Sequence, residues 1–426
     1  MNLFKLEKSQ IKTEIFAGMT TFFTMSYVII LIPQLLSQAG MPSSTVFTAA
    51  LLLIGLINIF MGIFSNLPFV LAPFMGDIIF VSYTLVPMGY STGEVSAIYL
   101  LIGFFLILMT LSKFRLRFLD SLPESVKLSF TVGLGVCLWF SGLKNCGMID
   151  YKDNLLSLSL LNLNDYHIWL GLLGLGFILL LDRLKVKVSI IIGLVGLTVL
   201  GVLIKDTNLP SQIFSLPPSM SPILFKCDFS NIFSQKMIIL FFMLFLLVNT
   251  ELHGSIVSVM MKYRESDFVK LQKSINKTLY VDSAATTFAA GAGIPATGVY
   301  VDSITGIMSG GKTGLTSVTT GVIFLFALFI SPLFSIVPAY AYAAALLYIG
   351  SLLCLTLKDM KFYDATEYLP FLFTIGVIVF TLNLGLGMTF SFIVYPLFKL
   401  VFKRVNEVPK EFWLFTVLSV LFFILR

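Results

Sequence analysis

Apolar runs long enough to cross a lipid bilayer recur along nearly the whole sequence. A window of about 19 residues, the length of a membrane-spanning helix, finds them in two groups on either side of a polar stretch at residues 205–235. In order, the runs span residues 15–36, 46–65, 70–88, 95–111, 123–143, 168–181, 188–204, 237–260, 279–290, 295–308, 315–334, 337–357, 368–384 and 388–402. Only 12% of the residues are charged, about half the share found in a soluble domain. We therefore predict an all-α polytopic membrane protein with fourteen transmembrane segments.

Apolar runs near the two ends of the chain need separate interpretation. The first run is longer than the apolar core of a signal peptide, about 7–15 residues, and is therefore predicted to be the first span. A last run, at residues 412–425, is short for a vertical span. Residues 405–426 are predicted to form an interfacial or only partly inserted helix.

Lysine and arginine residues concentrate in the loops that follow the even-numbered segments. They include Lys113, Arg115, Arg117, Arg183, Lys185, Lys187, Lys262, Arg264, Lys270, Lys273, Lys277, Lys358, Lys361, Lys399, Lys403 and Arg404. Because cytoplasmic loops carry an excess of these residues, we expect a cytoplasmic amino terminus. The expected location is the plasma membrane, and more narrowly a bacterial inner membrane. The net charge of +6 reflects these loops and does not indicate nucleic-acid binding.

The third and tenth segments are broken by glycine and proline, at residues 67–87 and 291–314. Irregular backbone is tolerated at membrane depth only where it is buried in protein or lines a cavity. The two halves also share Leu122-Pro123 before the fifth segment and Val337-Pro338 before the twelfth. With seven segments in each half, the second repeat must insert upside down relative to the first. This is the plan of secondary transporters, whose site lies at the repeat interface.

Few ionisable residues fall inside the apolar segments. They are Asp77, Glu251, His253, Asp282 and Asp302. A charge at the bilayer centre costs about 2.5–3.5 kcal/mol on the mildest scale, and such residues are functional-site candidates by default. Asp282 follows the lysine-rich start of its segment and is expected near the membrane interface. The four cysteines have no CxxC spacing and the two histidines are far apart, so we expect no metal site and no bound cofactor.

Glu251 lies in the middle of the eighth segment, within VNTELHGS. Glu251 and Ser255 are four residues apart and therefore share a helix face, so a carboxylate and a hydroxyl can face one ligand. A carboxylate accepts two N–H bonds side by side, which suits the edge of a heterocycle. His253 is expected on another face, as a proton-relay group. The alternative is that Glu251 only caps a neighbouring broken helix.

Asp302 and Ser303 occupy the break of the tenth segment, and Asp77 follows the break of the third. Each acid is expected near the amino terminus of a short helix, where the helix dipole favours negative charge. Substrate or proton-coupling roles are predicted for both acids, as for Glu251, and Ser303 is predicted to contact the substrate. The repeat predicts that Asp77 and Asp302 face each other across the site. The alternative for each is a helix cap. Phe74 and Tyr300 are candidates for stacking on a planar ligand, although in a chain with 14% aromatic residues packing is the commoner role.

Several stretches together resemble the nucleobase–cation symporter 2 family, in its azaguanine-type branch of adenine, guanine and hypoxanthine permeases. They are KTEIFAGMTTFF at 12–23, LSQAGMPSSTVFTAA at 36–50, LAPFMG at 71–76, VDSAATTFAAGAG at 281–293, YVDSITGIMSGGKTGLTSVTTG at 300–321, SPLFSIVPAYAYAAALLYIG at 331–350 and DATEYLPFLFTIG at 364–376. These stretches cover nearly the whole chain.

The resemblance implies two inverted repeats of seven segments, uracil-permease-like, with short strands in segments 3 and 10 meeting the substrate. It implies a core domain at 1–112 and 236–334, a gate domain at 113–205 and 335–404, an extracellular linker at 206–235 and the carboxy-terminal helix at 405–426. The family's acids in segments 8 and 10 correspond to Glu251 and Asp302. Import of a purine-type nucleobase with protons, or with sodium as the alternative, is implied, and a homodimer through the gate is suggested.

The chain departs from the pattern of that branch in segment 3. The branch usually has APGMGLNAF, whereas this chain has APFMGDIIF, with Phe74 for glycine and Asp77 for leucine. The carboxylate lengths are also exchanged, because the branch has Asp in segment 8 and Glu in segment 10. An extra acid is expected to favour a more basic heterocycle.

Three alternatives to nucleobase transport remain. One is a transporter of the same fold for another small heterocycle. Another is an inorganic anion exchanger, which three acids near the site disfavour because an anion would meet uncompensated like charge. The least favoured is a membrane-embedded enzyme using Glu251 and His253 in acid–base catalysis, since the sequence offers no nucleophile or metal constellation.

Overall fold

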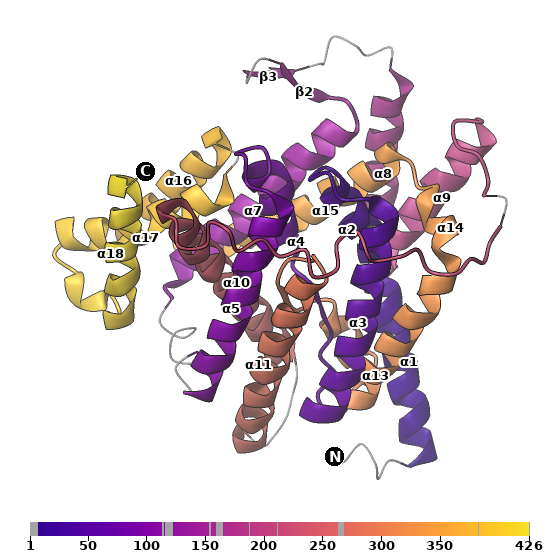
Figure 1. Ribbon diagram of the computed structural model, residues 1–426, viewed down its shortest axis with the longest axis horizontal. Helices are drawn as coiled ribbons and strands as arrows, with labels where there is room; N and C mark the ends of the chain where they lie inside the picture. Colours follow the sequence, from indigo (N-terminus) through magenta and orange to yellow (C-terminus); the bar gives the residue numbers. More distant parts are fainter. Residues whose placement is uncertain are drawn as a thin grey trace.

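The structure, a computed structural model, is a bundle of apolar helices (Figure 1). It describes residues 7–112, 115, 122–152, 155–158, 165–186, 188–210, 212–262, 268–381 and 383–425. Within these residues, nine helices are long and apolar enough to cross a membrane. Three shorter apolar helices lie at Met75–Leu85, Ser189–Leu203 and Ala365–Thr381. The predicted helical, polytopic membrane protein is confirmed.

The first half of the chain contains a break at each of its first and third segments. Its elements are α1 (Lys8–Met25), α2 (Val28–Ser37), α3 (Ser43–Ser65), β1 (Leu71–Pro73), α4 (Met75–Phe80), the π-helical turn η1 (Val81–Leu85), α5 (Thr92–Leu111), α7 (Glu124–Asn145), β2 (Ile149–Lys152), β3 (Leu155–Leu158), α8 (Tyr166–Arg183) and α9 (Ser189–Leu203). The hairpin of β2 and β3 was not foreseen. The stretch between α9 and α10 then crosses the bundle without a regular helix (Figure 1).

The second half repeats the pattern of a strand followed by a short helix. Its elements are α10 (Gln235–Lys262), α11 (Phe268–Gly291), β4 (Thr297–Val299), α12 (Ser303–Met308), α13 (Gly314–Ala327), η3 (Leu328–Ile330), α14 (Ser331–Ser335), α15 (Ala339–Cys354), η4 (Leu355–Asp359), α16 (Ala365–Thr381), α17 (Leu384–Val401), η5 (Val405–Glu407) and α18 (Lys410–Leu425). Helix α11 begins earlier than the predicted segment at residue 279, because the lysines of its first turns lower the hydropathy without breaking the helix. Helix α18 packs on α17 through Phe392 and Phe412, whose ring centroids are 5.1 Å apart.

The two broken segments pair with each other as a small buried sheet. Strands β1 and β4 are antiparallel, with Ala72 opposite Gly298. The ladder is extended by the Phe74 N–H, which donates to the Ala296 carbonyl at 2.9 Å, and by the Tyr300 N–H, which donates to the Val70 carbonyl at 2.8 Å. The short strands expected in segments 3 and 10 are therefore present.

Side chains from two neighbouring helices satisfy the outer edges of this sheet. Asn58 of α3 donates to the Leu71 carbonyl at 2.8 Å and accepts from the Leu71 N–H at 2.7 Å. Thr286 of α11 accepts from the Thr297 N–H at 3.4 Å. Because water is absent inside a membrane protein core, exposed strand edges must find protein partners there. Asparagine and threonine on flanking helices supply them.

The most extensive helix contacts join opposite halves of the chain. They pair α3 with α13, α7 with α15 and α5 with α11. Close approach depends on glycine, because a Cβ at Gly314 of α13 would overlap the backbone of Gly62 in α3. Small residues allow such approach between membrane helices. The two halves are thereby interleaved around the β1–β4 sheet.

Candidate functional site

Glu251 links helix α10 to the start of the short helix α4. The Gly76 N–H donates to Glu251 Oε1 at 3.0 Å, and a Cβ at Gly76 would overlap the carboxylate. Glu251 is partly exposed, and its Oε2 has no hydrogen-bond partner in the described part of the chain. The helix-capping contact considered from the sequence is therefore present. It uses one oxygen and leaves the other free, so the ligand-binding role of Glu251 remains a prediction.

Asp302 stands at the amino terminus of α12 without capping it. Its side chain forms no cap hydrogen bond to that helix. Instead it accepts a hydrogen bond from the Tyr27 hydroxyl, with Tyr27 Oη 3.2 Å from Asp302 Oδ2. Asp302 is partly exposed. Its carboxylate therefore faces the junction of α1 and α2, where Tyr27 lies.

Tyr27 is a site neighbour that the sequence analysis missed. It is 6% exposed and lies between α1 and α2, where the first apolar segment is interrupted. The available signal was a tyrosine in mid-segment beside Ser26. In an apolar run that includes many aromatic residues, this signal does not stand out.

Ser303 and Tyr300 use their polar groups to brace the small sheet. Ser303 Oγ accepts from the Val70 N–H at 3.0 Å and donates to the Tyr300 carbonyl at 2.6 Å. The Tyr300 hydroxyl donates to the Pro73 carbonyl at 2.6 Å. Both residues are buried. Their predicted substrate contacts would have to come from the Tyr300 ring face or from rearranged bonds.

Ser255 lies one helical turn after Glu251 on α10, and its ligand-binding role remains a prediction. Its hydroxyl donates to the carbonyls of Glu251 at 2.9 Å and Leu252 at 3.2 Å, within its own helix. The side chain of His253 lies outside the described part of the structure.

Phe74 lies against β4. Its ring occupies the space where a Cβ at Gly298 would stand, and it is 5% exposed. Phe74 therefore fills the space above the strand that a glycine at position 74 would leave open. The sequence departure at this position reshapes the surroundings of the sheet.

We expect Gly298→Ala to destabilise the protein because the new methyl group would displace the Phe74 ring. Overpacking of this kind costs about 1–3 kcal/mol. In a Phe74→Ala background, Gly298→Ala should cause no further loss of stability, because the Phe74 ring is absent. Melting temperature in detergent measures both effects. The control is Gly376→Ala, at a glycine of α16 where an added Cβ meets nothing within 4 Å; equal stability of Gly298→Ala and this control would contradict the packing described.

Asp77 interacts with Glu251 and has no exposed surface. Neither of its carboxylate oxygens has a hydrogen-bond partner among the described residues. The groups that act on it electrostatically include Glu251 and Tyr99. Asp77 does not cap α4, because the capping oxygen at that helix comes from Glu251.

Asp282, which was expected near the membrane interface, lies in a buried ion pair. Its Oδ2 lies 2.6 Å from Arg115 Nη2, and both side chains are 0% exposed. Arg115 also donates to Asn249 Oδ1 at 3.3 Å and to Ser283 Oγ at 2.7 Å. This pair was not foreseen, because the partner of Asp282 comes from a distant part of the chain; the position of Asp282 relative to the membrane interface stays a prediction. Arg115 thereby ties the chain after α5 to α10 and α11.

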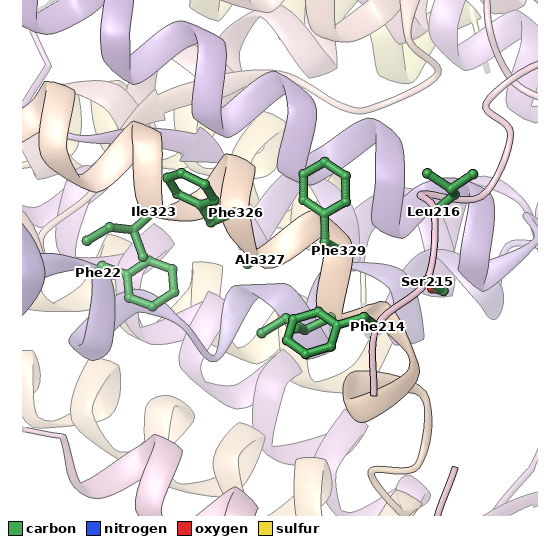
Figure 2. Close-up of a pocket in the computed structure, with 9 residues that line it drawn as sticks. Phe22, Phe214, Ser215, Leu216, Ile323, Phe326, Ala327 and Phe329 are labelled. Atoms are coloured by element: carbon green, nitrogen blue, oxygen red, sulfur yellow. The ribbon is translucent and has the colours of Figure 1, made fainter. Parts of the chain in front are cut away.

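A large groove elsewhere in the molecule is apolar. Figure 2 shows Phe22, Ile323, Phe326 and Phe329 around it, with the segment at Phe214 closing one side. Its volume is about 740 Å³. None of the candidate site residues lines it, and none of its described lining residues is charged. A polar ligand would find no recognition there.

The sequence matches the model of the Permease family over residues 12–394. It is similar to the adenine permease AdeQ of Escherichia coli strain K12, with 34% identity over 94% of this chain and 91% of that protein. It is also similar to the guanine/hypoxanthine permease PbuO of Bacillus subtilis strain 168, with 28% identity over 99% of this chain and 98% of that protein. Among solved structures, the transmembrane domain of the cyanobacterium bicarbonate transporter BicA matches with a TM-score of 0.67 and 17% identity, covering 90% of this chain and 98% of that one. At this identity the likeness shows the fold alone.

Proposed function

The chain belongs to the Permease family, and we propose that it is a secondary active transporter that imports a purine-type nucleobase, such as guanine, hypoxanthine or adenine, by proton symport. The observation that carries this proposal is the full-length similarity to adenine and guanine/hypoxanthine permeases. The partly exposed carboxylates of Glu251 and Asp302, next to the β1–β4 sheet, provide the chemistry that such a ligand needs.

The two carboxylates suit the polar edges of a purine. Glu251 has an unbonded Oε2 that accepts an N–H of the base, while its Oε1 stays on the Gly76 amide. Asp302 and the Tyr27 hydroxyl form an acceptor and donor pair for another edge. Hydrogen bonds to charged groups contribute about 1.5–3 kcal/mol each. A neutral planar base therefore gains both orientation and affinity from these residues.

The proposed architecture is fourteen segments in two inverted repeats of seven. Its support is the pairing of α3 with α13 and of α5 with α11, because exchanging the halves converts one pair into the other. Asn58 and Thr286 satisfy opposite edges of the sheet and lie on α3 and α11, the second segments of their halves. Such correspondence is typical of inverted-repeat transporters.

Transport would proceed by movement of a core domain against a gate domain, an elevator-like motion. The core comprises residues 1–112 and 236–334, and the gate comprises 113–205 and 335–404, joined by the linker at 206–235. The amino terminus faces the cytoplasm in the bacterial inner membrane, in keeping with the distribution of lysine and arginine. A homodimer through the gate domain is part of the same proposal.

The BicA fold makes an anion exchanger the second candidate function. The acids around the sheet oppose it. Asp77 and Glu251 have carboxylate oxygens without hydrogen-bond donors among the described residues, and an anion beside them would meet like charge in a poorly solvated site. A same-fold transporter for another small heterocycle remains compatible with these residues, and an enzyme is the least compatible because the family is one of permeases.

Equilibrium binding separates these candidates. Purified protein in detergent is titrated with radiolabelled adenine, guanine, hypoxanthine, xanthine and uracil. We expect saturable binding of at least one purine, which excess bicarbonate or sulfate does not displace. Displacement by an inorganic anion would support the exchanger, and failure of every base to bind would refute the nucleobase assignment.

A further inference from the structure

Recognition of the base by Glu251 and Asp302 gives no role to the third acid, Asp77. It is 0% exposed, so its side chain does not touch a ligand that enters from solvent in this structure. Both of its oxygens lack a hydrogen-bond partner within the described part of the chain. A buried carboxylate in this condition is strongly disfavoured as an anion, because bulk solvent does not reach it and no hydrogen bond of ordinary length stabilises its charge.

The surroundings of Asp77 add negative rather than positive charge. Glu251 acts on it from α10 and Asp282 acts on it from α11. The Tyr99 hydroxyl of α5 is a donor that acts on Asp77, but no hydrogen bond of ordinary length joins the two side chains. Tyr300 beyond β4 also interacts with Asp77. The cation associated with Asp282, Arg115, is engaged in that ion pair.

The other helices packed on α4 supply no compensating cation at Asp77. Helix α2 has no titratable residue in its sequence, VIILIPQLLS. Helix α7 carries Glu124 and Lys127 in its first turn and Lys144 in its last, with the buried thiol of Cys137 between them. In the π-helical turn that continues α4, the Tyr83 hydroxyl accepts a hydrogen bond from Asn145 at 3.2 Å. The charged side chains that act on Asp77 are those of Glu251 and Asp282, both acids.

From this arrangement we propose that Asp77 is the binding site of the transported proton. The proposal rests on the proposed function and identifies which acid couples base movement to the proton gradient. A proton bound to one Asp77 oxygen forms one O–H bond and neutralises the carboxylate. Once Asp77 is neutral, the neighbouring Glu251 keeps its negative charge for binding the base.

The position of Asp77 next to Gly76 couples the two acids. The Gly76 N–H holds Glu251 Oε1, so movement of Glu251 on binding a base also moves the backbone at Asp77. With Asp77 protonated, a neutral base and one negative carboxylate cross together. The proton leaves Asp77 for water when the site opens to the cytoplasm, and no bond of the base changes.

A sodium ion fits this location less well than a proton. Hard metal cations take six or more oxygen ligands in proteins such as calcium sites, or several retained waters in magnesium sites. A proton needs only the single carboxylate.

The test compares concentrative uptake with exchange in proteoliposomes. For the unaltered protein we expect an inward proton gradient to drive accumulation of the purine that it binds, with matching acidification of a dye-loaded lumen. In Asp77→Asn we expect accumulation and acidification to fall at least tenfold. Exchange of labelled for unlabelled base across the membrane should remain measurable, because exchange needs no net proton movement. Asp165→Asn, at a carboxylate outside the helices that bonds His167, is the matched control and should behave as the unaltered protein does.

The outcomes distinguish this proposal from the proposed function. If the unaltered protein moves no base, the proposed function fails. If it accumulates base and Asp77→Asn does so equally with unchanged acidification, Asp77 is not the proton site. Accumulation that follows a sodium gradient and is lost in Asp77→Asn also overturns the proposal, in favour of sodium. Asp77→Leu, an uncharged variant without hydrogen-bonding groups, repeats the comparison if the asparagine variant is unstable, and the same loss of accumulation with retained exchange is expected.

Discussion

Glu251→Gln is expected to lower nucleobase affinity by at least tenfold, to about 150-fold, and to lower uptake with it. Glutamine keeps the length of the side chain and can still accept the Gly76 N–H that Glu251 Oε1 accepts at 3.0 Å. It then presents an NH2 group where Oε2 stood, so a donor meets the N–H of the base. The loss of this one hydrogen bond to a charged group, at about 1.5–3 kcal/mol, corresponds to a factor of about 10–150.

Binding of radiolabelled base to purified protein measures this effect. The matched control is Glu124→Gln, at a glutamate whose side chain is 75% exposed and pairs with Lys361. We expect the control to bind as the unaltered protein does. Retention of affinity within threefold in Glu251→Gln would remove Glu251 from the binding site and leave it only its contact with α4.

Arg115→Ala is expected to destabilise the protein by about 3–5 kcal/mol, the usual cost of breaking a buried ion pair by removing one partner. The change leaves the Asp282 carboxylate buried, with its Oδ1 already unbonded among the described residues. It also removes the bonds from Arg115 to Asn249 and Ser283. The expected readout is a large fall in melting temperature and in the yield of monodisperse protein.

The double variant Arg115→Leu/Asp282→Leu should recover much of this loss, because no unpaired charge remains in the core. Arg404→Ala is the control, since the Arg404–Asp364 pair is partly exposed, at 49% and 24%, and such pairs contribute about 0–1 kcal/mol. A fall in melting temperature for Arg115→Ala no larger than that for Arg404→Ala would show that the buried pair does not hold α5, α10 and α11 together.

The elements that are bounded by glycine and proline, or that consist of one uninterrupted apolar run, were predictable from the sequence. Glycine and proline marked the breaks that became β1 and β4, and an uninterrupted apolar run marked α3. The extra hairpin of β2 and β3 was missed although β2, IDYK, alternates apolar and polar residues, because each strand is only four residues long. Hydropathy placed the start of α11 too late, because the lysines in its first turns are compatible with a helix that leaves the membrane.

The sequence predicted individual residues of the candidate site but not the contacts between them. Glu251 and Asp302 stood out because a carboxylate is rare in an apolar segment, but the bonds that they form join distant parts of the chain. Tyr27 contacts Asp302 across a separation of 275 residues, and Arg115 reaches Asp282 across 167. A single sequence does not show such pairings. Arg115 lies in a basic loop, where an arginine indicates only on which side of the membrane the loop lies. The ion pair of Asp282 was accordingly not predicted.

The most direct test of nucleobase transport is uptake of radiolabelled adenine, guanine, hypoxanthine, xanthine and uracil into proteoliposomes, with and without an inward proton gradient. We predict that at least one purine accumulates above its external concentration when the gradient is present and only equilibrates when it is collapsed. Uptake of none of the five bases by stable, correctly inserted protein would contradict nucleobase transport and leave the family assignment as a description of fold.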